Sequence, residues 1–228
     1  LDGSANIVAY DDNPAGWTGS GTPASGDYYA NVTISPINAR IEINELTYSG
    51  TLTSFEVEGI YINNYYANMP LNLQTTDPGT TLTNNGSTTS FYDRSNVNFA
   101  YTNYSTLYDV IENAVTPAGG AATVNPGTGV WAYHVFGNHN PVPHIIIKLT
   151  DVIDAGGNNL GERYLTVKGF TQNSNSQELS VLSRANIYQI ASLAFDDNDL
   201  QILPETETIN IWVQVTVTPW STVPVTPI

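Results

Sequence analysis

Ile209-Asn-Ile-Trp-Val-Gln-Val-Thr-Val-Thr-Pro219 is the stretch of this 228-residue chain that decides its fold class. Isoleucine or valine stands at every second position, and mostly polar residues stand between them. Side chains of an extended strand point alternately to the two faces of a sheet, so this period of two predicts a half-buried β-strand. The side chains expected in the core are Ile211, Val213, Val215 and Val217. Pro219 has no N–H and is expected to end the strand.

The chain continues past this strand into a second, shorter apolar segment. It comprises Trp220, then Val223-Pro-Val225, and it runs on to Ile228. Chain ends are usually loose and polar. The tail, residues 209–228, is therefore expected to dock on folded protein. The sequence leaves open whether it folds back on its own domain or is donated to another molecule.

Similar period-two patterns recur along the chain. They predict strands over residues 6–10, 28–34, 39–46, 55–63, 130–136, 144–149, 163–168 and 185–195. Residues 63–130 are expected to form a long polar loop region. Within it, residues 106–115 carry apolar side chains at helical spacing and predict the one helix. Short strands separated by turn signals predict an all-β, antiparallel Greek-key β-sandwich with long polar loops over residues 37–228. Residues 1–36 are expected to add one or two strands, or an extended arm.

The charge balance excludes one class of partner. Six Lys and Arg residues oppose 21 Asp and Glu residues, which gives a net charge of −15. Binding of nucleic acid needs cations that displace counterions from phosphate, so no nucleic acid partner is expected. The chain has no cysteine, which removes disulfides, thiolate metal sites and cysteine nucleophiles. No run approaches the roughly 20 apolar residues of a membrane helix.

No motif points to catalysis or to a bound cofactor. His134, His139 and His144 are five residues apart, which places neighbours on opposite faces of a strand rather than around one metal ion. Asp11-Asp-Asn13 and Asp196-Asp-Asn-Asp199 could offer oxygen ligands, but the second lacks the glycine and glutamate of an EF-hand loop, and solvated acidic turns are expected. We therefore expect no metal, no cofactor and no enzymatic activity. A glycoside hydrolase needs only two carboxyl groups and stays an alternative.

The aromatic content supports a second alternative. The chain contains 14 Tyr and 4 Trp, and several aromatic residues fall in the expected loop region, where binding residues tend to lie. These are Tyr65, Tyr66, Phe91, Tyr92, Tyr101, Tyr104 and Tyr108. Stacking of sugars on them would make the chain a carbohydrate-binding module. Packing within a sandwich explains the same residues.

Five segments, taken in order, resemble the Bacteroidales fimbrillins, the type V pilins. They begin at Asn38-Ala-Arg-Ile-Glu-Ile and Thr53-Ser-Phe-Glu-Val-Glu-Gly-Ile-Tyr-Ile-Asn-Asn. They continue through Gly129-Val-Trp-Ala-Tyr-His-Val-Phe and Ser183-Arg-Ala-Asn-Ile-Tyr-Gln-Ile to Val215-Thr-Val-Thr-Pro-Trp220. The resemblance runs from about residue 37 to residue 228. It implies that this part is the family's C-terminal sandwich domain. Residues 1–36 stand where the family has a complete N-terminal domain.

The resemblance also implies a function. Similar pilins are structural and adhesive subunits of cell-surface fimbriae, anchored at or exported across the outer membrane, and they polymerise by strand exchange. Other pilin subunits are then the expected partners, with glycans or proteins of host or bacterial surfaces as adhesive targets. The residues of the polymerisation tail are expected to be Trp220, Val223, Val225 and Ile228. Strand addition is physically sensible because main-chain hydrogen bonds supply affinity while alternate side chains fill pockets.

Overall fold

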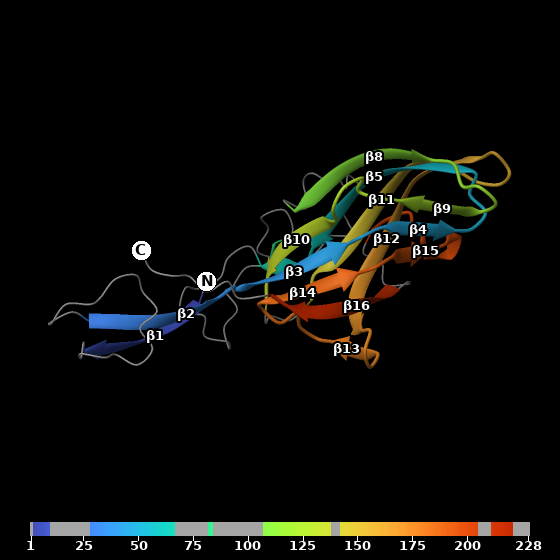
Figure 1. Cartoon of the computed structure of the whole chain (residues 1–228). Helices are drawn as coiled ribbons and strands as arrows, with labels where there is room; N and C mark the ends of the chain where they lie inside the picture. Colours follow the sequence, from blue (N-terminus) through green and yellow to red (C-terminus); the bar gives the residue numbers. More distant parts are fainter. Residues whose placement is uncertain are drawn as a thin grey trace.

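The structure is a computed structural model. It describes residues 2–9, 28–66, 82–83, 107–137, 142–204 and 211–220, and describes side chains over residues 36–65, 107–137, 142–204 and 211–220. Among these residues the chain is all-β, as expected (Figure 1). The one helical element of the described residues is a 3-10 turn at Asp197–Asp199. No helix in the described part is long and apolar enough to cross a membrane.

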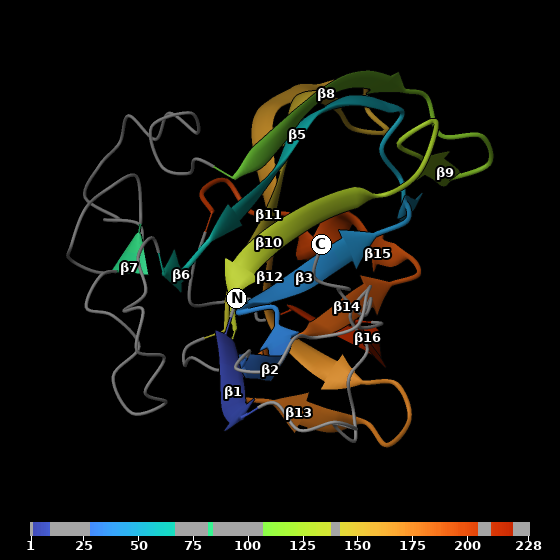
Figure 2. The same cartoon turned by 60° about the vertical axis from the view of Figure 1, so that its left-hand side comes forward.

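Nine of the strands form one large sheet. Its order is β10-β3-β14-β16-β12-β11-β5-β8, and β13 pairs with β12 beside this path. The bounds are β3 Asn38–Ile43, β5 Ser54–Asn63, β8 Tyr108–Val115, β10 Trp131–Phe136, β11 His144–Ile153, β12 Asn159–Gln172, β13 Gln177–Leu179, β14 Asn186–Ile190 and β16 Ile211–Pro219. The sheet curls until it is nearly closed. β10, β3, β14 and β16 follow one another on one side, with β5, β11 and β12 behind them (Figure 2).

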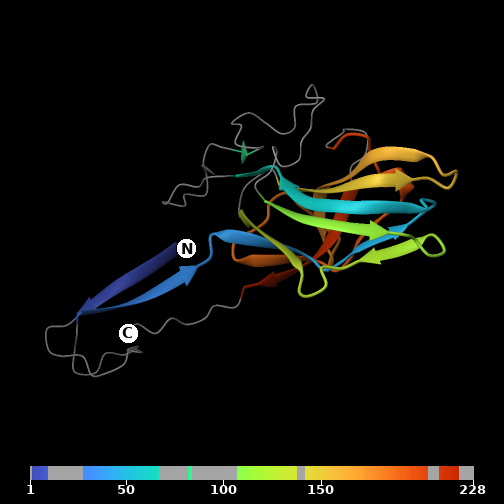
Figure 3. The ribbon, with the colours of Figure 1, turned by 90° about the horizontal axis from the view of Figure 1, so that it is seen from above.

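Smaller sheets complete the described structure. β4 (Leu46–Ser49), β9 (Ala121–Val124) and β15 (Leu193–Phe195) form a three-stranded sheet that continues from β3, β10 and β14. β6 (Tyr65–Tyr66) pairs with β7 (Leu82–Thr83). β1 (Asp2–Ala9) and β2 (Tyr28–Ser35) pair with each other and with no other described strand. This hairpin projects away from the large sheet (Figure 3). The two strands expected in residues 1–36 overlap β1 and β2.

One face of the curled sheet supplies the core. Alternate residues of β3 are buried (Ala39, Ile41 and Ile43), as the sequence pattern predicts. They pack in the same cluster as Ile145 and Ile147 of β11, which are 0% exposed. Burial of one apolar face of each strand is the main stabilising term for such a sheet.

Three pairings differ from the expected antiparallel arrangement. β3 and β14, β12 and β16, and β4 and β15 run parallel. An alternating pattern reports that one face of a strand is buried and says nothing about the direction of its neighbour. The antiparallel prediction was therefore too narrow. The Greek-key connection stays a prediction.

The expected helix over residues 106–115 is wrong. Tyr108–Val115 forms β8, which pairs antiparallel with β5. The register shifts opposite Glu58, where Ile111 and Glu112 occupy the place of one residue and Glu112 has φ 48°. Such a β-bulge moves the apolar side chains out of strict alternation, and that produced the apparent helical spacing. β8 and β9 also show that residues 107–130 are not a continuous loop.

The single strand expected over residues 185–195 is two strands. β14 ends at Ile190 and β15 begins at Leu193. The break lies where the large sheet gives way to the three-stranded sheet: the Asn44 N–H donates to the Ile190 carbonyl, and the Leu193 N–H donates to the Glu45 carbonyl.

Candidate functional site at the C-terminal strand

β16 connects the two halves of the large sheet. Its first half, from Ile211 to Val215, pairs parallel with β12. Its second half, from Thr216 to Pro219, pairs antiparallel with β14. The strand ends at Pro219, as predicted. The part of the tail that ends there is therefore an integral strand of the chain's own sheet.

The inward side chains of β16 enter the core to different depths. Val215 is 0% exposed and Val213 is 7% exposed. Ile211 and Val217 are half-buried and pack against the same cluster. The predicted inward face is thus confirmed, with its centre buried more completely than its ends.

On the outward face, Trp212 is 45% exposed. Its ring lies on Gly169 of β12, where a Cβ atom would come within 2.3 Å of two ring carbons. Glycine therefore allows the indole to lie close to the backbone of β12.

Trp220, the first residue after β16, is held by this chain. Its N–H donates to the Ala185 carbonyl at 2.9 Å. Its ring meets the ring of His134 edge-on, with centroids 5.7 Å apart and planes at 63°. Burial of the imidazole, and then the nearby charge of Arg40, lower the pKa of His134 below its usual value. A neutral His134 therefore faces Trp220 at pH 7.

The remaining tail residues proposed for polymerisation, Val223, Val225 and Ile228, lie outside the described residues. The polymerisation role of the tail therefore stays a prediction, also for Trp220. The structure shows how far the tail belongs to its own sheet: hydrogen bonds to the sheet extend along the tail as far as Trp220.

The candidate metal ligands do not converge. His134 contacts Arg40 and Trp220, while the His144 imidazole lies 3.5 Å from the Asn64 amide nitrogen. His139 and residues 11–13 lie outside the described residues. Within the described ranges, no three His, Asp or Glu side chains come together as a metal site.

The acidic turn at Asp196–Asp199 has a structural role. Asp197 accepts hydrogen bonds from the Thr51 N–H at 2.9 Å, from the Thr51 hydroxyl at 2.6 Å and from the Tyr48 hydroxyl. Asp196 caps the 3-10 turn through the Asn198 N–H, and Asp199 accepts from the Asp196 N–H. These carboxylates act as hydrogen-bond acceptors for the protein itself.

The aromatic residues considered for sugar stacking divide into two groups. Tyr65 is 6% exposed and belongs to the core. Tyr108 is 42% exposed and stacks on Tyr61, with ring centroids 5.7 Å apart. The positions of the Tyr66, Phe91, Tyr92, Tyr101 and Tyr104 side chains lie outside the described part of the chain.

Sequence reasoning missed a buried cation. Lys148 of β11 is 9% exposed, and its ammonium lies 2.6 Å from Glu58 Oε2 and 3.0 Å from Glu162 Oε1. Burial alone would lower the pKa of Lys148, but hydrogen bonds to the two carboxylates outweigh it and raise the pKa. The lysine within the apolar run 144–149 could have predicted this ion pair. A cation on a buried strand needs carboxylates on the flanking strands.

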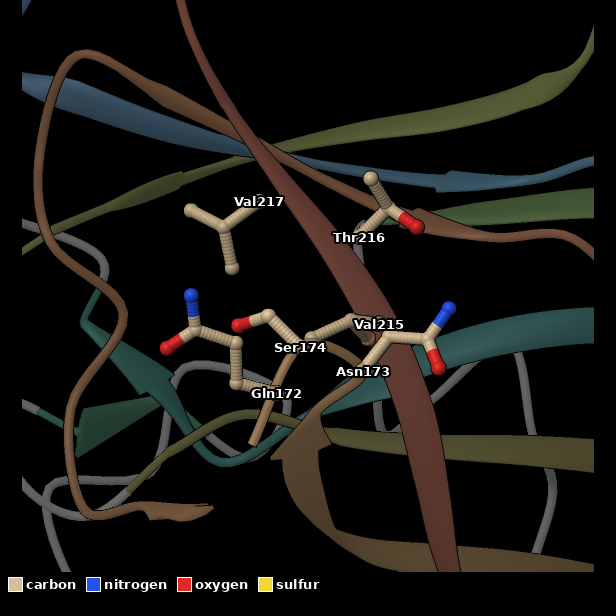
Figure 4. Close-up of a pocket in the computed structure, with 6 residues that line it drawn as sticks. All are labelled: Gln172, Asn173, Ser174, Val215, Thr216 and Val217. Atoms are coloured by element: carbon tan, nitrogen blue, oxygen red, sulfur yellow. The ribbon is translucent and has the colours of Figure 1, made fainter. Parts of the chain in front are cut away.

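A pocket of about 280 Å³ lies beside the second half of β16 (Figure 4). Gln172, Asn173 and Ser174, where β12 turns toward β13, line it together with Val215, Thr216 and Val217 of β16. Gln172, Ser174 and Val217 lie on one side of the β16 ribbon in this view, and Asn173 and Thr216 on the other. The pocket therefore opens at the edge of β16. No sequence pattern predicts this pocket, because its position depends on where β12 and β16 separate.

Comparison with known proteins places the chain in no family. No family model and no curated protein sequence matches it. Among solved structures, the chain is similar to that of a candidate cell adhesion protein from Parabacteroides distasonis, with 16% identity and a TM-score of 0.42. The match covers 82% of this chain and 54% of the other, so the chain spans about half the length of that protein. A likeness this weak assigns no activity, partner or residue role, and the resemblance to the fimbrillins stays a prediction.

Proposed function

We propose that this chain is a structural and adhesive subunit of a bacterial surface fimbria, and that it assembles with other subunits by strand exchange through its C-terminal tail. The proposed role is non-catalytic, and its partners are further pilin subunits together with surface glycans or proteins. The sequence resemblance to the fimbrillins suggests this role. The net charge of −15 disfavours a nucleic acid partner.

The observation that carries the proposal is the division of the tail at Trp220. Residues 211–215 pair with β12 and residues 216–219 pair with β14, and Val213 and Val215 are buried, so this strand belongs to the chain's own core. A strand that fills the core cannot be donated without large loss of buried apolar area. Donation therefore falls to residues 221–228, whose sequence Ser-Thr-Val-Pro-Val-Thr-Pro-Ile has no charged side chain.

The test is performed on the bacterium that carries the gene. A deletion strain is complemented with the full gene or with a copy that lacks codons 221–228, and surface fimbriae are counted by immunogold electron microscopy. Fimbriae are expected with the full gene and not with the shortened one. Equal numbers of fimbriae in the two strains, at matched export of the protein, would refute strand exchange through the tail.

A carbohydrate-binding module is the second candidate, favoured by the exposed ring of Trp212. Aromatic rings with an apolar face open to water are suited to stacking with sugars. A glycan array separates this candidate from the first: binding that is lost in Trp212→Ala, while fimbriae are unaffected, supports a lectin-like role. Absence of binding to the whole array removes it.

A further inference from the structure

One edge of β16 loses its partner within the sheet. The Asn173 N–H donates to the Val215 carbonyl at 2.9 Å, so the peptide groups of Val215 point toward β12. Peptide groups two residues apart on a strand point to the same side. Those of Val217 therefore point the same way, but the pairing with β12 ends opposite Val215, at Gln172.

The pairing with β14 leads to the same orientation. The Trp220 N–H donates to the Ala185 carbonyl, and the register of β14 continues from there to Thr216. Alternation then directs the peptide groups of Thr218 and Thr216 toward β14 and those of Val217 away from it. Within the part of the chain that the structure describes, no hydrogen bond reaches the Val217 N–H or carbonyl.

The free edge is short. Val217 offers one donor and one acceptor, and Pro219, the next residue facing this side, offers only a carbonyl because proline has no N–H. In the other direction along β16, the Val215 carbonyl already accepts a hydrogen bond from the Asn173 N–H, so the free edge ends there. An added strand would have room for a few residues.

The polar side chains around this edge are uncharged and face solvent rather than other protein groups. The pocket presents the amides of Gln172 and Asn173 and the hydroxyls of Ser174 and Thr216. None of these four side chains forms a hydrogen bond in the described structure. Val215 and Val217 supply the apolar part of the lining, and no charged residue lines the pocket of a chain with net charge −15.

We propose that this pocket is a peptide-binding site, in which an extended, uncharged segment of a partner protein adds as a short strand to the free edge of β16 at Val217. The Val217 N–H and carbonyl pair with the backbone of the added segment, and the amides and hydroxyls of the pocket bind its remaining peptide groups. A small β-branched side chain packs against Val217, the half-buried valine of the lining. Main-chain pairing with side-chain pockets is how exposed sheet edges bind peptides.

The lining disfavours other ligands. Anionic groups need a cation or converging N–H groups, and an acidic peptide would also meet the chain's negative charge. A sugar site usually offers an aromatic ring for stacking, and none of the six lining residues is aromatic. The site does not depend on fimbrial assembly, because it concerns an acceptor edge rather than the tail that is donated.

The free chain provides the first measurement. In hydrogen exchange followed by NMR, the amide of Val217 is expected to exchange at least tenfold faster than those of Thr216 and Thr218, whose N–H groups bind β14. Equally slow exchange at all three amides would overturn the proposal, because the edge would then already be occupied.

The second measurement adds a ligand. The ¹⁵N-labelled full chain is titrated with the acetylated and amidated pentapeptide Thr-Val-Thr-Val-Thr at millimolar concentrations. The largest amide shift is expected at Val217, and its exchange is expected to slow at least tenfold at saturation. A pentapeptide of the same length with Glu in place of Thr is expected to bind at least tenfold more weakly.

A matched pair of variants locates the site. Gln172→Lys places a long charged side chain in the pocket and is expected to weaken pentapeptide binding at least fivefold. Gln214→Lys makes the same change on the exposed face of β16 outside the pocket and is expected to leave binding unchanged. Equal effects of the two variants, or shifts in the wild type that avoid Val217, would overturn the proposal. A shift at Val217 with N-acetylglucosamine and none with the peptide would assign the pocket to sugars and refute it.

Discussion

At the scale of single residues, one carboxylate joins the 3-10 turn to β4 and the loop that follows it. Asp197 accepts hydrogen bonds from Thr51 and Tyr48, and the Tyr48 hydroxyl accepts one from the Leu52 N–H at 2.7 Å. Gly50 lies so close that a Cβ atom there would come within 2.4 Å of both Asp197 Oδ1 and the Tyr48 hydroxyl. The short 3-10 turn is thereby attached to the end of β4.

The hydrogen bonds to Asp197 predict that the stability of the fold depends on pH. Burial alone would raise the pKa of Asp197, but the hydrogen bonds from Thr51 and Tyr48 outweigh it and hold the pKa below its ordinary value of 3.8. A carboxylate with a depressed pKa stabilises the fold fully above the unfolded value and loses that contribution as the pH falls through the folded value. Asp197→Asn is expected to cost about 1–2 kcal/mol at pH 7 and to flatten the loss of stability below pH ~4.

Urea unfolding between pH 2 and pH 7 measures this effect. Asp151→Asn is the matched control, since Asp151 is exposed and its removal is expected to change the curve little. The interpretation fails if the two variants have the same pH profile.

A second prediction concerns Gly169 and Trp212. In Gly169→Ala the new methyl group would overlap the indole ring, and overpacking costs roughly 1–3 kcal/mol. We expect the lower end of that range, because a ring that is 45% exposed can move outward. The double variant Gly169→Ala with Trp212→Ala is expected to lose less stability than the sum of the two single changes. Strictly additive free energies of unfolding would show that the contact does not constrain position 169.

At the scale of elements, two valines of β16 lie in different environments. Val215 is fully buried where β16 pairs with β12, and Val217 is half-buried beside the pocket, where β16 pairs with β14. Val215→Ala is therefore expected to cost roughly 2–3 kcal/mol and Val217→Ala roughly half as much. Both variants remove the same two methyl groups from the same strand, so the difference measures burial. Equal losses in chemical denaturation would contradict the described packing.

The strands also show how far sequence reasoning reaches. Period two was sufficient for β10 and β16, because each of them buries one face and meets no interruption. The single strand expected over residues 39–46 is divided, because β3 ends at Ile43 and β4 begins at Leu46, where the chain passes from the large sheet to the three-stranded sheet. Period two failed at β8, where the bulge at Glu112 shifts the pattern. It could not give the parallel pairings, since alternation does not encode direction.

The candidate site was partly readable from sequence. The alternation and Pro219 predicted where β16 lies and where it ends, because both follow from local chemistry. Trp220 and His134, which are in contact, lie more than 80 positions apart along the chain. The free edge at Val217 depends on the end of β12, which lies about 40 positions earlier. Such arrangements follow from the register of neighbouring strands, which no local pattern specifies.

At the scale of the whole molecule, the proposed function divides the chain into a sheet that includes β16 and a tail, residues 221–228, that is donated in assembly. The sheet includes β16 and curls around the main core. The net charge of −15 makes copies of the chain repel one another, so contact between subunits is favoured at uncharged segments. Residues 221–228 form such a segment.

Deletion of residues 221–228 tests this separation most directly. The melting temperature and the sedimentation profile of the purified chain are measured with and without the segment, under conditions in which the full chain polymerises. If the segment is donated, the melting temperature of the monomer is expected to shift by no more than about 2 °C, which corresponds to well under 1 kcal/mol for a domain of this size. Polymers are expected to be lost completely. A monomer destabilised by several kcal/mol with unchanged polymerisation would contradict this expectation, because the segment would then be part of the chain's own core.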